Sequence, residues 1–169
     1  MSVDATGALA TYLGWLAPWG APVTLLGERV DQILLARREL ARIGFDRVTG
    51  WAVGVPAAWA RPDDLTGFRR SDFAELAAAR AMHADVIVLD VRRRLEWRAS
   101  HLDGARNIPL HEVVERVGEL PPGPVWVHCA SGFRAAVAAS LLERRGREVV
   151  LVDDPYVAAA WAGLPTLAA

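Results

Sequence analysis

Short apolar runs alternate with helix-like segments along the second half of the chain. The apolar runs cover residues 85–90, 125–128 and 149–152. Continuous apolar runs of this length are typical of strands that are buried on both faces of a parallel sheet. The intervening patterns predict helices over residues 71–80, 133–145 and 155–161, and a weaker helix over 113–120.

The ends of these elements carry local signals that define the fold class. Ser71 is the predicted N-cap of its helix, with Asp72 in the first turn, and Gly146 is placed to end the helix that begins at residue 133. Strands that alternate with helices predict an α/β fold with a parallel sheet covered on both faces. In such sheets ligands bind beyond the carboxyl ends of the strands, where the sequence places Asp90 and Cys129.

When the sequence is aligned with itself at a shift of 102 positions, without a gap, two segments match. Pro22 aligns with Pro124, and Gly44 aligns with Gly146. The run Ala57-Ala58-Trp59-Ala60 falls on residues 159–162. These matches lie at a strand start, a helix end and a terminal helix. The chain is therefore interpreted as two copies of one α/β unit.

The two copies differ in their completeness and in their candidate chemistry. Cys129 falls on Gly27, and Arg134 falls on Gln32. The front section of the second copy, about residues 71–107, has no counterpart because it would lie before Met1. We therefore predict a truncated, catalytically inactive half-repeat over residues 1–65 and a complete domain over residues 66–169. An ordinary α/β extension of the second unit is the alternative interpretation of residues 1–65.

Composition and charge exclude several classes of function. The chain has 169 residues, of which 53% are apolar, and its formal net charge is −1. This balance predicts no general attraction to nucleic acid or to an anionic membrane, and no stretch is long and apolar enough to span a bilayer. A single cysteine forms no internal disulfide, and no signal-peptide pattern is present, so a cytoplasmic location is expected. The four histidines show no ligand spacing, so neither a metal nor a cofactor is expected.

Cys129 is the strongest candidate for chemistry. It opens the run Cys129-Ala130-Ser131-Gly132-Phe133-Arg134, between an apolar strand and a helix. Unpaired N–H groups at the start of a helix stabilise a thiolate, and the loop amides can form a nest for an anion. The alternative is a cysteine buried as a small apolar residue, but this explains neither Gly132 nor Arg134.

Several ordered motifs resemble the rhodanese (sulfurtransferase) domain. They are Leu89-Asp90-Val91-Arg92, Glu96-Trp97, HLDGARNIP over residues 101–109 and VHCASGFR over residues 127–134. The resemblance covers about residues 68–169 and implies a rhodanese-like fold of three layers. The tandem is also similar to the C-terminal region of bacterial metallo-β-lactamase–rhodanese fusion proteins, which are persulfide-dioxygenase-like. Their metal domain has no counterpart here, so dioxygenase activity is not expected.

The resemblance implies a double displacement through a persulfide of Cys129. The thiolate takes sulfane sulfur from thiosulfate or a low-molecular-weight persulfide and passes it to a thiophilic acceptor such as a thiol or cyanide. Residues 130–134 would form the loop that cradles the extra sulfur. Within this loop Ser131 would either donate its hydroxyl to the sulfur or cap the following helix.

Three residues outside the loop are implied as supporting residues. Arg134 would either face the donor or hold the shape of the loop by pairing with a carboxylate, and Glu96 is favoured as that partner. Asp90 and Arg92 match family positions near the pocket. For Asp90 the favoured interpretation is a polar residue at a strand end that ties loops together.

Two other functions stay open. Cysteine phosphatases and arsenate reductases of the same fold have five residues between the cysteine and the arginine, whereas four residues separate Cys129 from Arg134. A smaller ring of amides suits a single sulfur atom better than a phosphate. The second alternative is a non-catalytic persulfide carrier or docking module. The unpaired edge predicted for the strand over residues 23–26 favours a homodimer, or docking to a metal-dependent partner enzyme through residues 1–65.

Overall fold

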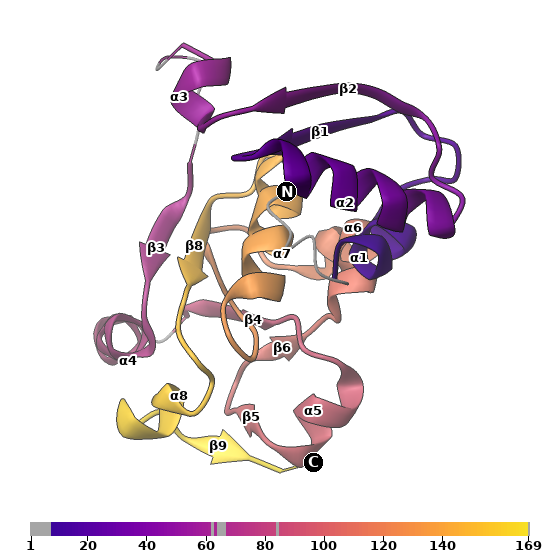
Figure 1. Ribbon diagram of the computed structural model, residues 1–169. Coiled ribbons are helices and arrows are strands. Elements are labelled where there is room, and N and C mark those ends of the chain that lie inside the picture. The colour runs from indigo at the N-terminus through magenta and orange to yellow at the C-terminus, as the bar shows by residue number, and fades with distance from the viewer. Residues whose placement is uncertain (1–7, 62, 64–66, 84, 169) are drawn as a thin grey trace. The chain divides into compact units, whose positions relative to one another are not determined.

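The computed structural model describes residues 8–61, 63, 67–83 and 85–168 (Figure 1). The chain divides into two compact units, with the boundary between Gly67 and Phe68. Among the described residues, no helix combines the length and the apolar character needed to cross a membrane. The two units are described in turn.

The smaller unit is built around two parallel strands. Its described elements are α1 (Ala8–Leu16), β1 (Val23–Gly27), α2 (Val30–Arg42), β2 (Val48–Val53) and α3 (Pro56–Trp59). Helix α2 presents Ile33, Ala36 and Leu40 on one face, at the three- and four-residue spacing of an amphipathic helix. These side chains form a core with Leu9, Leu25 and Phe45. Both strands also carry exposed apolar residues, among them Leu26, Trp51 and Val53.

The larger unit contains a five-stranded parallel sheet of order β3-β8-β7-β4-β6. The strands are β3 (Arg69–Ser71), β4 (Ile87–Asp90), β6 (Arg106–Asn107), β7 (Val125–His128) and β8 (Val149–Val152). The helices are α4 (Phe73–Met82), α5 (Arg94–Ala99), α6 (Val113–Arg116), α7 (Phe133–Glu143) and α8 (Ala158–Trp161), with the 3₁₀ turns η2 (Leu110–Glu112) and η3 (Val117–Glu119). Strands β5 (His101–Leu102) and β9 (Thr166–Leu167) form a separate antiparallel pair.

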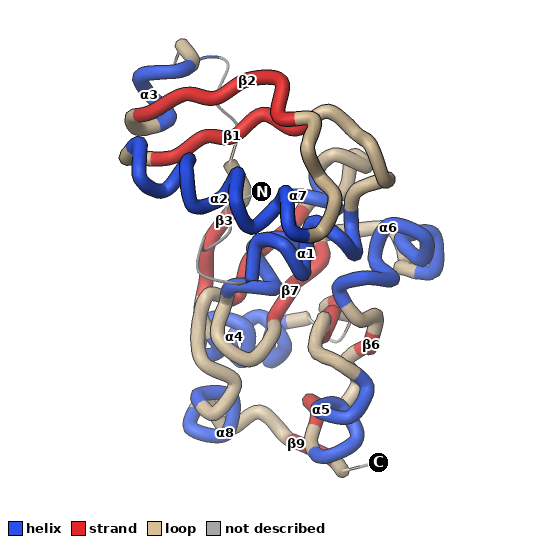
Figure 2. Tube along the Cα trace, turned by 45° about the vertical axis from the view of Figure 1, so that its right-hand side comes forward, coloured by secondary structure: helices blue, strands red, loops and turns tan. Residues whose placement is uncertain are grey.

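Helices cover both faces of this sheet, as Figures 1 and 2 show. On one face Phe73 and Leu76 of α4 and Ala159 of α8 pack on Trp126 and Val150. On the other face α7 packs against β7 and β8, with Val137, Ala138, Ala139 and Leu142 buried. This arrangement explains why every residue of β7 and β8 is buried. The α/β class with a parallel sheet, expected from the sequence, is confirmed.

One local prediction is wrong. Ser71 is the last residue of β3, and Asp72 caps α4 by accepting a 2.8 Å hydrogen bond from the backbone N–H of Glu75. Asp72 is therefore the N-cap and not a first-turn residue. Ser71 lies in a strand that the sequence pattern does not indicate, because Arg69 to Ser71 pair with β8 despite their polar side chains.

The order β1-α2-β2-α3 repeats as β7-α7-β8-α8 at the displacement found in the sequence. Strands β1 and β7 begin at Val23 and Val125, and α3 and α8 occupy Pro56–Trp59 and Ala158–Trp161. The pairs β1–β2 and β7–β8 are both parallel. In the larger unit β7 also pairs with β4, whereas the described part of the chain offers β1 no strand other than β2. The interpretation of residues 1–65 as a truncated repeat stays a prediction.

Candidate functional site

Cys129 directly follows β7, at the carboxyl end of a strand that pairs with β4 and β8. Its thiol is free, and only 1% of the residue is exposed. The neighbouring strand β4 ends at Asp90, which lies opposite His128 in the register. The sheet therefore brings the two strand ends that the sequence singled out to the same edge.

The loop after Cys129 turns at Gly132, whose φ is +86°. L-residues with a side chain rarely adopt this conformation. Space is a second constraint, because a Cβ at Gly132 would collide with the carboxylate of Asp153. Asp153 follows β8 and pairs with Arg70 of β3. A glycine is thus required by both the backbone and the packing.

The loop continues into α7, and its end is held by a bidentate ion pair. Arg134 donates from Nη1 to Glu96 Oε2 at 2.7 Å and from Nη2 to Glu96 Oε1 at 2.8 Å. Glu96 Oε2 also accepts a 3.0 Å hydrogen bond from the backbone N–H of Arg93, at the start of α5. The hydrogen bonds from Arg134 lower the pKa of Glu96 to about 2. The pairing of Arg134 with Glu96, favoured from the sequence, is confirmed.

Asp90 and Arg92 form a buried pair at the end of β4. Arg92 donates from Nη2 to Asp90 Oδ2 at 2.6 Å, and its backbone N–H donates to Asp90 Oδ1 at 2.8 Å. Arg92 Nη2 also reaches the carbonyl of Ser100 at 2.7 Å, and Asn107 donates to the carbonyls of both Asp90 and Arg92. Asp90 therefore ties together the chain segments around the strand end, as the sequence interpretation proposed.

Tyr156 connects this pair to the cysteine loop. Its ring lies under the Arg92 guanidinium, with 3.6 Å between the guanidinium carbon and the ring centroid. Its backbone N–H donates a 3.0 Å hydrogen bond to the carbonyl of Ala130. The hydroxyl of Tyr156 is 3.3 Å from Ser100 Oγ. Tyr156 thus fixes one end of the loop, while the pair of Arg134 with Glu96 fixes the other.

His128 is fully buried on the same side as Tyr156. Its ring stacks on Tyr156 with 5.7 Å between centroids and meets Phe73 edge-on at 5.5 Å. Among the described residues, neither ring nitrogen has a hydrogen-bond partner. Burial lowers the pKa of His128 to about 4, although Asp90 Oδ2 lies 3.8 Å from Nε2 and acts in the opposite direction. His128 is therefore neutral at physiological pH.

The remaining loop residues have simpler environments. Ser131 is exposed, and the N-cap of α7 is Gly132 with no side-chain hydrogen bond, so of the two roles considered for Ser131 the structure does not show helix capping. Ala130 and Phe133 are partly buried. In the part of the chain that is described, no group of three or more potential metal ligands is present.

Sequence reasoning missed Asp153 and Tyr156. Both follow β8, a strand that was predicted at its observed bounds. The rule that ligands gather beyond the carboxyl ends of parallel strands could have marked them, because β8 neighbours β7. Their contacts with Gly132 and Ala130 bridge more than twenty positions and leave no local pattern.

The sequence of the larger unit matches a known protein family. The Rhodanese-like domain family matches residues 73–159, about half of the chain, and the chain belongs to that family. The rhodanese-like domain of an Anabaena protein superposes with a TM-score of 0.54 at 26% identity, covering 61% of this chain and 81% of that domain. A Staphylococcus aureus rhodanese-like domain protein gives a TM-score of 0.52 at 22% identity, covering 54% of this chain and 91% of that chain.

Two curated relatives are similar over parts of their length. The HTH-type transcriptional regulator Rv0324 of Mycobacterium tuberculosis is 35% identical over 84 residues, which cover 48% of this chain and 37% of the regulator. The protein named "Putative sulfur carrier protein YrkF" of Bacillus subtilis is 35% identical over 65 residues, covering 38% of this chain and 35% of that protein. The chain thus spans little more than a third of either relative.

Proposed function

We propose that the protein is a sulfurtransferase that moves sulfane sulfur through a persulfide on Cys129. The observation that carries this proposal is the short loop from Cys129 to Arg134. It begins at the end of a central parallel strand, turns at a glycine with positive φ, and is held at both ends by Tyr156 and Glu96. Such a loop directs its backbone N–H groups toward one small anion.

The reaction has two displacements. The Cys129 thiolate attacks the outer sulfur of thiosulfate or of a low-molecular-weight persulfide, and a new S–S bond forms at the cysteine. The S–S bond of the donor breaks, and sulfite or a thiolate leaves with the electron pair. An acceptor thiolate or cyanide then attacks the outer sulfur of the persulfide, and the cysteine thiolate leaves. No external oxidant or reductant is needed.

Arg134 acts in this proposal as a positioning residue. Both of its terminal nitrogens donate to Glu96, so its charge is compensated within the fold. The amides of residues 130–134 would stabilise the outer sulfur of the persulfide. Asp90 and Arg92 support the loop through the ring and backbone of Tyr156.

Intact-mass measurement tests the persulfide directly. Incubation of the full chain with thiosulfate or glutathione persulfide should add one sulfur atom, and cyanide should remove it as thiocyanate. Cys129→Ser should take up no sulfur, because it removes the only thiol. A wild-type protein that takes up no sulfur from either donor would contradict the proposal. Hydrolysis of an aryl phosphate that depends on Cys129 would instead support the phosphatase alternative.

A persulfide carrier is the second candidate, and the name of the related YrkF supports it. A carrier would accept sulfur at Cys129 but would release it slowly to small thiols. Comparing persulfide formation with its discharge by a small thiol or cyanide separates the two functions. Discharge that is slower than loading by orders of magnitude favours the carrier.

For residues 1–65 we propose an inactive rhodanese-like half-repeat that serves association. The repeated order of elements supports this. The edge of β1 that pairs with no other strand among the described residues, and the exposed Leu26 and Trp51, would contact a second copy of the chain. Docking to a metal-dependent partner enzyme is the alternative use of the same surface.

A further inference from the structure

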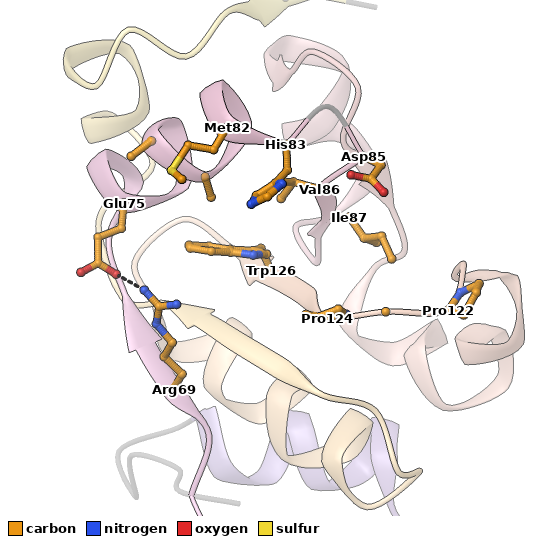
Figure 3. A pocket seen from close by; sticks show the side chains of 13 residues that line it. Arg69, Glu75, Met82, His83, Asp85, Val86, Ile87, Pro122, Pro124 and Trp126 are labelled. Atoms are coloured by element: carbon orange, nitrogen blue, oxygen red, sulfur yellow. Dashed lines mark hydrogen bonds and ion pairs between the residues drawn. The ribbon is translucent and has the colours of Figure 1, made fainter.

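A hollow lies in the larger unit, at the opposite end of β7 from Cys129. It is a cavity of about 600 Å³, open on one side, where α4 ends and the chain turns into β4. Trp126, the second residue of β7, forms its floor (Figure 3). Because Cys129 follows the last residue of the same strand, the cavity is separate from the cysteine loop. Its volume lies in the range of small-molecule sites.

The walls of this cavity are mainly apolar. Met82 and His83 stand above the indole of Trp126, and Ile87 and Pro124 close one end (Figure 3). Met82 is 77% exposed, although a side chain of this kind is usually buried. Prolines 122 and 124 flank Gly123, so this wall lacks two backbone donors and has little freedom to move. The cavity therefore offers a preformed apolar surface.

The indole of Trp126 already holds a planar cation. The guanidinium carbon of Arg69 lies 5.5 Å from its ring centroid. The electron-rich face of an indole attracts cations, and tryptophan is the strongest of the aromatic residues in this respect. The chain itself therefore shows the kind of group that this floor accepts.

The charges on the rim favour a cation as well. Arg69 is compensated by Glu75, with 3.0 Å between Nη2 and Oε2, and Figure 3 shows this pair at one end of the cavity. Asp85 lies toward the other end. Within the part of the chain that is described, its carboxylate has no hydrogen-bond or ion-pair partner. The uncompensated charge of the rim is therefore negative and lies away from Arg69.

From the apolar floor and this charge distribution, we propose that the cavity binds a small aromatic ligand with a cationic group, such as an aryl-alkyl amine. The ring system stacks on Trp126 beneath Met82, and the ammonium group faces Asp85. A carboxylate in the same position would be repelled by Asp85 and would not be attracted to the indole face. The proposal does not depend on the function proposed for Cys129.

Three naphthyl probes of similar size and different charge test this proposal. They are 2-naphthylmethylammonium, 2-naphthylmethanol and 2-naphthoate, titrated into the full chain at neutral pH. Binding is followed by NMR through the indole N–H signal of Trp126, which is assigned with Trp126→Phe. Ligands of this size are expected to bind with dissociation constants of about 1 mM. The ammonium probe should bind about five-fold more tightly than the alcohol, and more tightly still than the carboxylate.

Variants locate the site and its charge preference. Ala78→Trp, at an exposed lining position of α4, should fill the cavity and abolish binding of all three probes. Asp85→Asn should weaken only the ammonium probe, by about two- to five-fold. Asp46→Asn removes an exposed carboxylate of the smaller unit and should change nothing. Cys129→Ser should also leave binding unchanged.

Three results would overturn the proposal: equal affinity for the ammonium and carboxylate probes, undiminished binding in Ala78→Trp, or no binding of any probe at millimolar concentration. The test is independent of sulfur transfer, since each readout is binding and not activity. Far-ultraviolet circular dichroism of Ala78→Trp shows that the variant is folded. If it is not, Met82→Trp, at an exposed position of the same wall, takes its place.

Discussion

Arg134 and Glu96 form a bidentate ion pair that joins the second residue of α7 to the first turn of α5. The side chain of Arg134 is 15% exposed and that of Glu96 35% exposed, so water screens the pair only in part. The pair spans 38 positions of sequence and fixes the far end of the loop that begins at Cys129. The geometry of the loop therefore depends on a carboxylate that does not belong to it.

Glu96→Gln should lower the rate of sulfur transfer by about 10- to 100-fold, because small displacements of a reactive loop have effects of this size. The variant keeps the size of the side chain but loses both charge-assisted hydrogen bonds. The free energy of unfolding should fall by about 1–3 kcal/mol. Steady-state transfer from thiosulfate to cyanide and urea denaturation measure the two effects.

Glu112 offers a matched control, because it also accepts hydrogen bonds from two arginines, Arg94 and Arg116. It lies in η2, outside the loop, and within the described part of the chain no hydrogen bond joins it to residues 129–134, so Glu112→Gln should leave sulfur transfer within about two-fold of wild type. Full activity in Glu96→Gln would show that the ion pair does not hold the loop. Equal losses in both variants would indicate a general loss of stability.

Gly132→Ala should abolish sulfur transfer. The φ of +86° is unfavourable for alanine, at a cost of about 1–3 kcal/mol, and the added methyl group would also collide with Asp153. The double variant Gly132→Ala with Asp153→Ala removes the collision but keeps the backbone strain. It should be more stable than Gly132→Ala alone, as thermal denaturation would show.

Gly118→Ala is the control for this substitution, since a Cβ at Gly118 meets nothing within 4 Å and its φ is not positive. It should leave activity and melting temperature nearly unchanged. If Gly132→Ala retained wild-type turnover, the loop would have to accommodate a side chain by a movement that this structure does not show.

Acidification should destabilise the protein through His128 before it affects Glu96. The pKa of His128 is lowered from 6.5 to about 4 in the folded state, because the ring is buried. The unfolded chain therefore binds this proton first as the pH falls, and the folded state loses stability between pH 6.5 and 4. Between pH 7 and pH 4.5 the free energy of unfolding should fall by about 2–3 kcal/mol.

His128 and Glu96 affect the free energy of unfolding in different pH ranges. The pKa of Glu96 is lowered from 4.5 to about 2, so its contribution is lost only below about pH 4.5. His128→Phe, in an aromatic setting between Phe73 and Tyr156, should flatten the dependence above pH 4.5. His83→Phe, at an exposed histidine, should not alter it. An unchanged slope in His128→Phe would assign the acid sensitivity to other groups.

The central part of the fold was accessible from the sequence because its signals are local. Strands β7 and β8 are continuous apolar runs, and both were predicted at their observed bounds. Strand β3 was missed because Arg69 and Arg70 have exposed side chains at the sheet edge, so no apolar pattern marks them. The two-residue strands β5, β6 and β9 are too short to carry any periodicity.

The residues of the candidate site also differ in whether a local sequence signal marks them. Cys129 and Gly132 stand in a contiguous motif, and the pairing of Arg134 with Glu96 could be inferred from a choice between two carboxylates. Asp153 and Tyr156 carry no such local signal, because the carboxylate of Asp153 beside Gly132 and the backbone hydrogen bond from Tyr156 to Ala130 arise only where neighbouring strand ends meet. The depth of Cys129, which is 1% exposed, was also not evident, since a loop position after a strand predicts more exposure.

The last prediction concerns the smaller unit. In the larger unit β7 pairs with both β4 and β8, whereas among the described residues its counterpart β1 pairs with β2 alone. Leu26 is 57% exposed and Trp51 56% exposed on neighbouring strands of this sheet. An open strand edge beside exposed apolar residues favours pairing with another chain. Sedimentation at low micromolar concentration should therefore detect a species heavier than the 18.3 kDa monomer.

Two leucine substitutions make this test specific. Leu26→Glu places a charge on the exposed side of β1 and should shift the protein to monomer. Leu34→Glu places the same charge at a similarly exposed position of α2, 60% exposed, and should leave association unchanged. Equal effects of both would indicate non-specific apolar association and not pairing at the β1 edge. A wild-type protein that sediments as a monomer would remove the basis for self-association and leave docking to a different partner as the use of this surface.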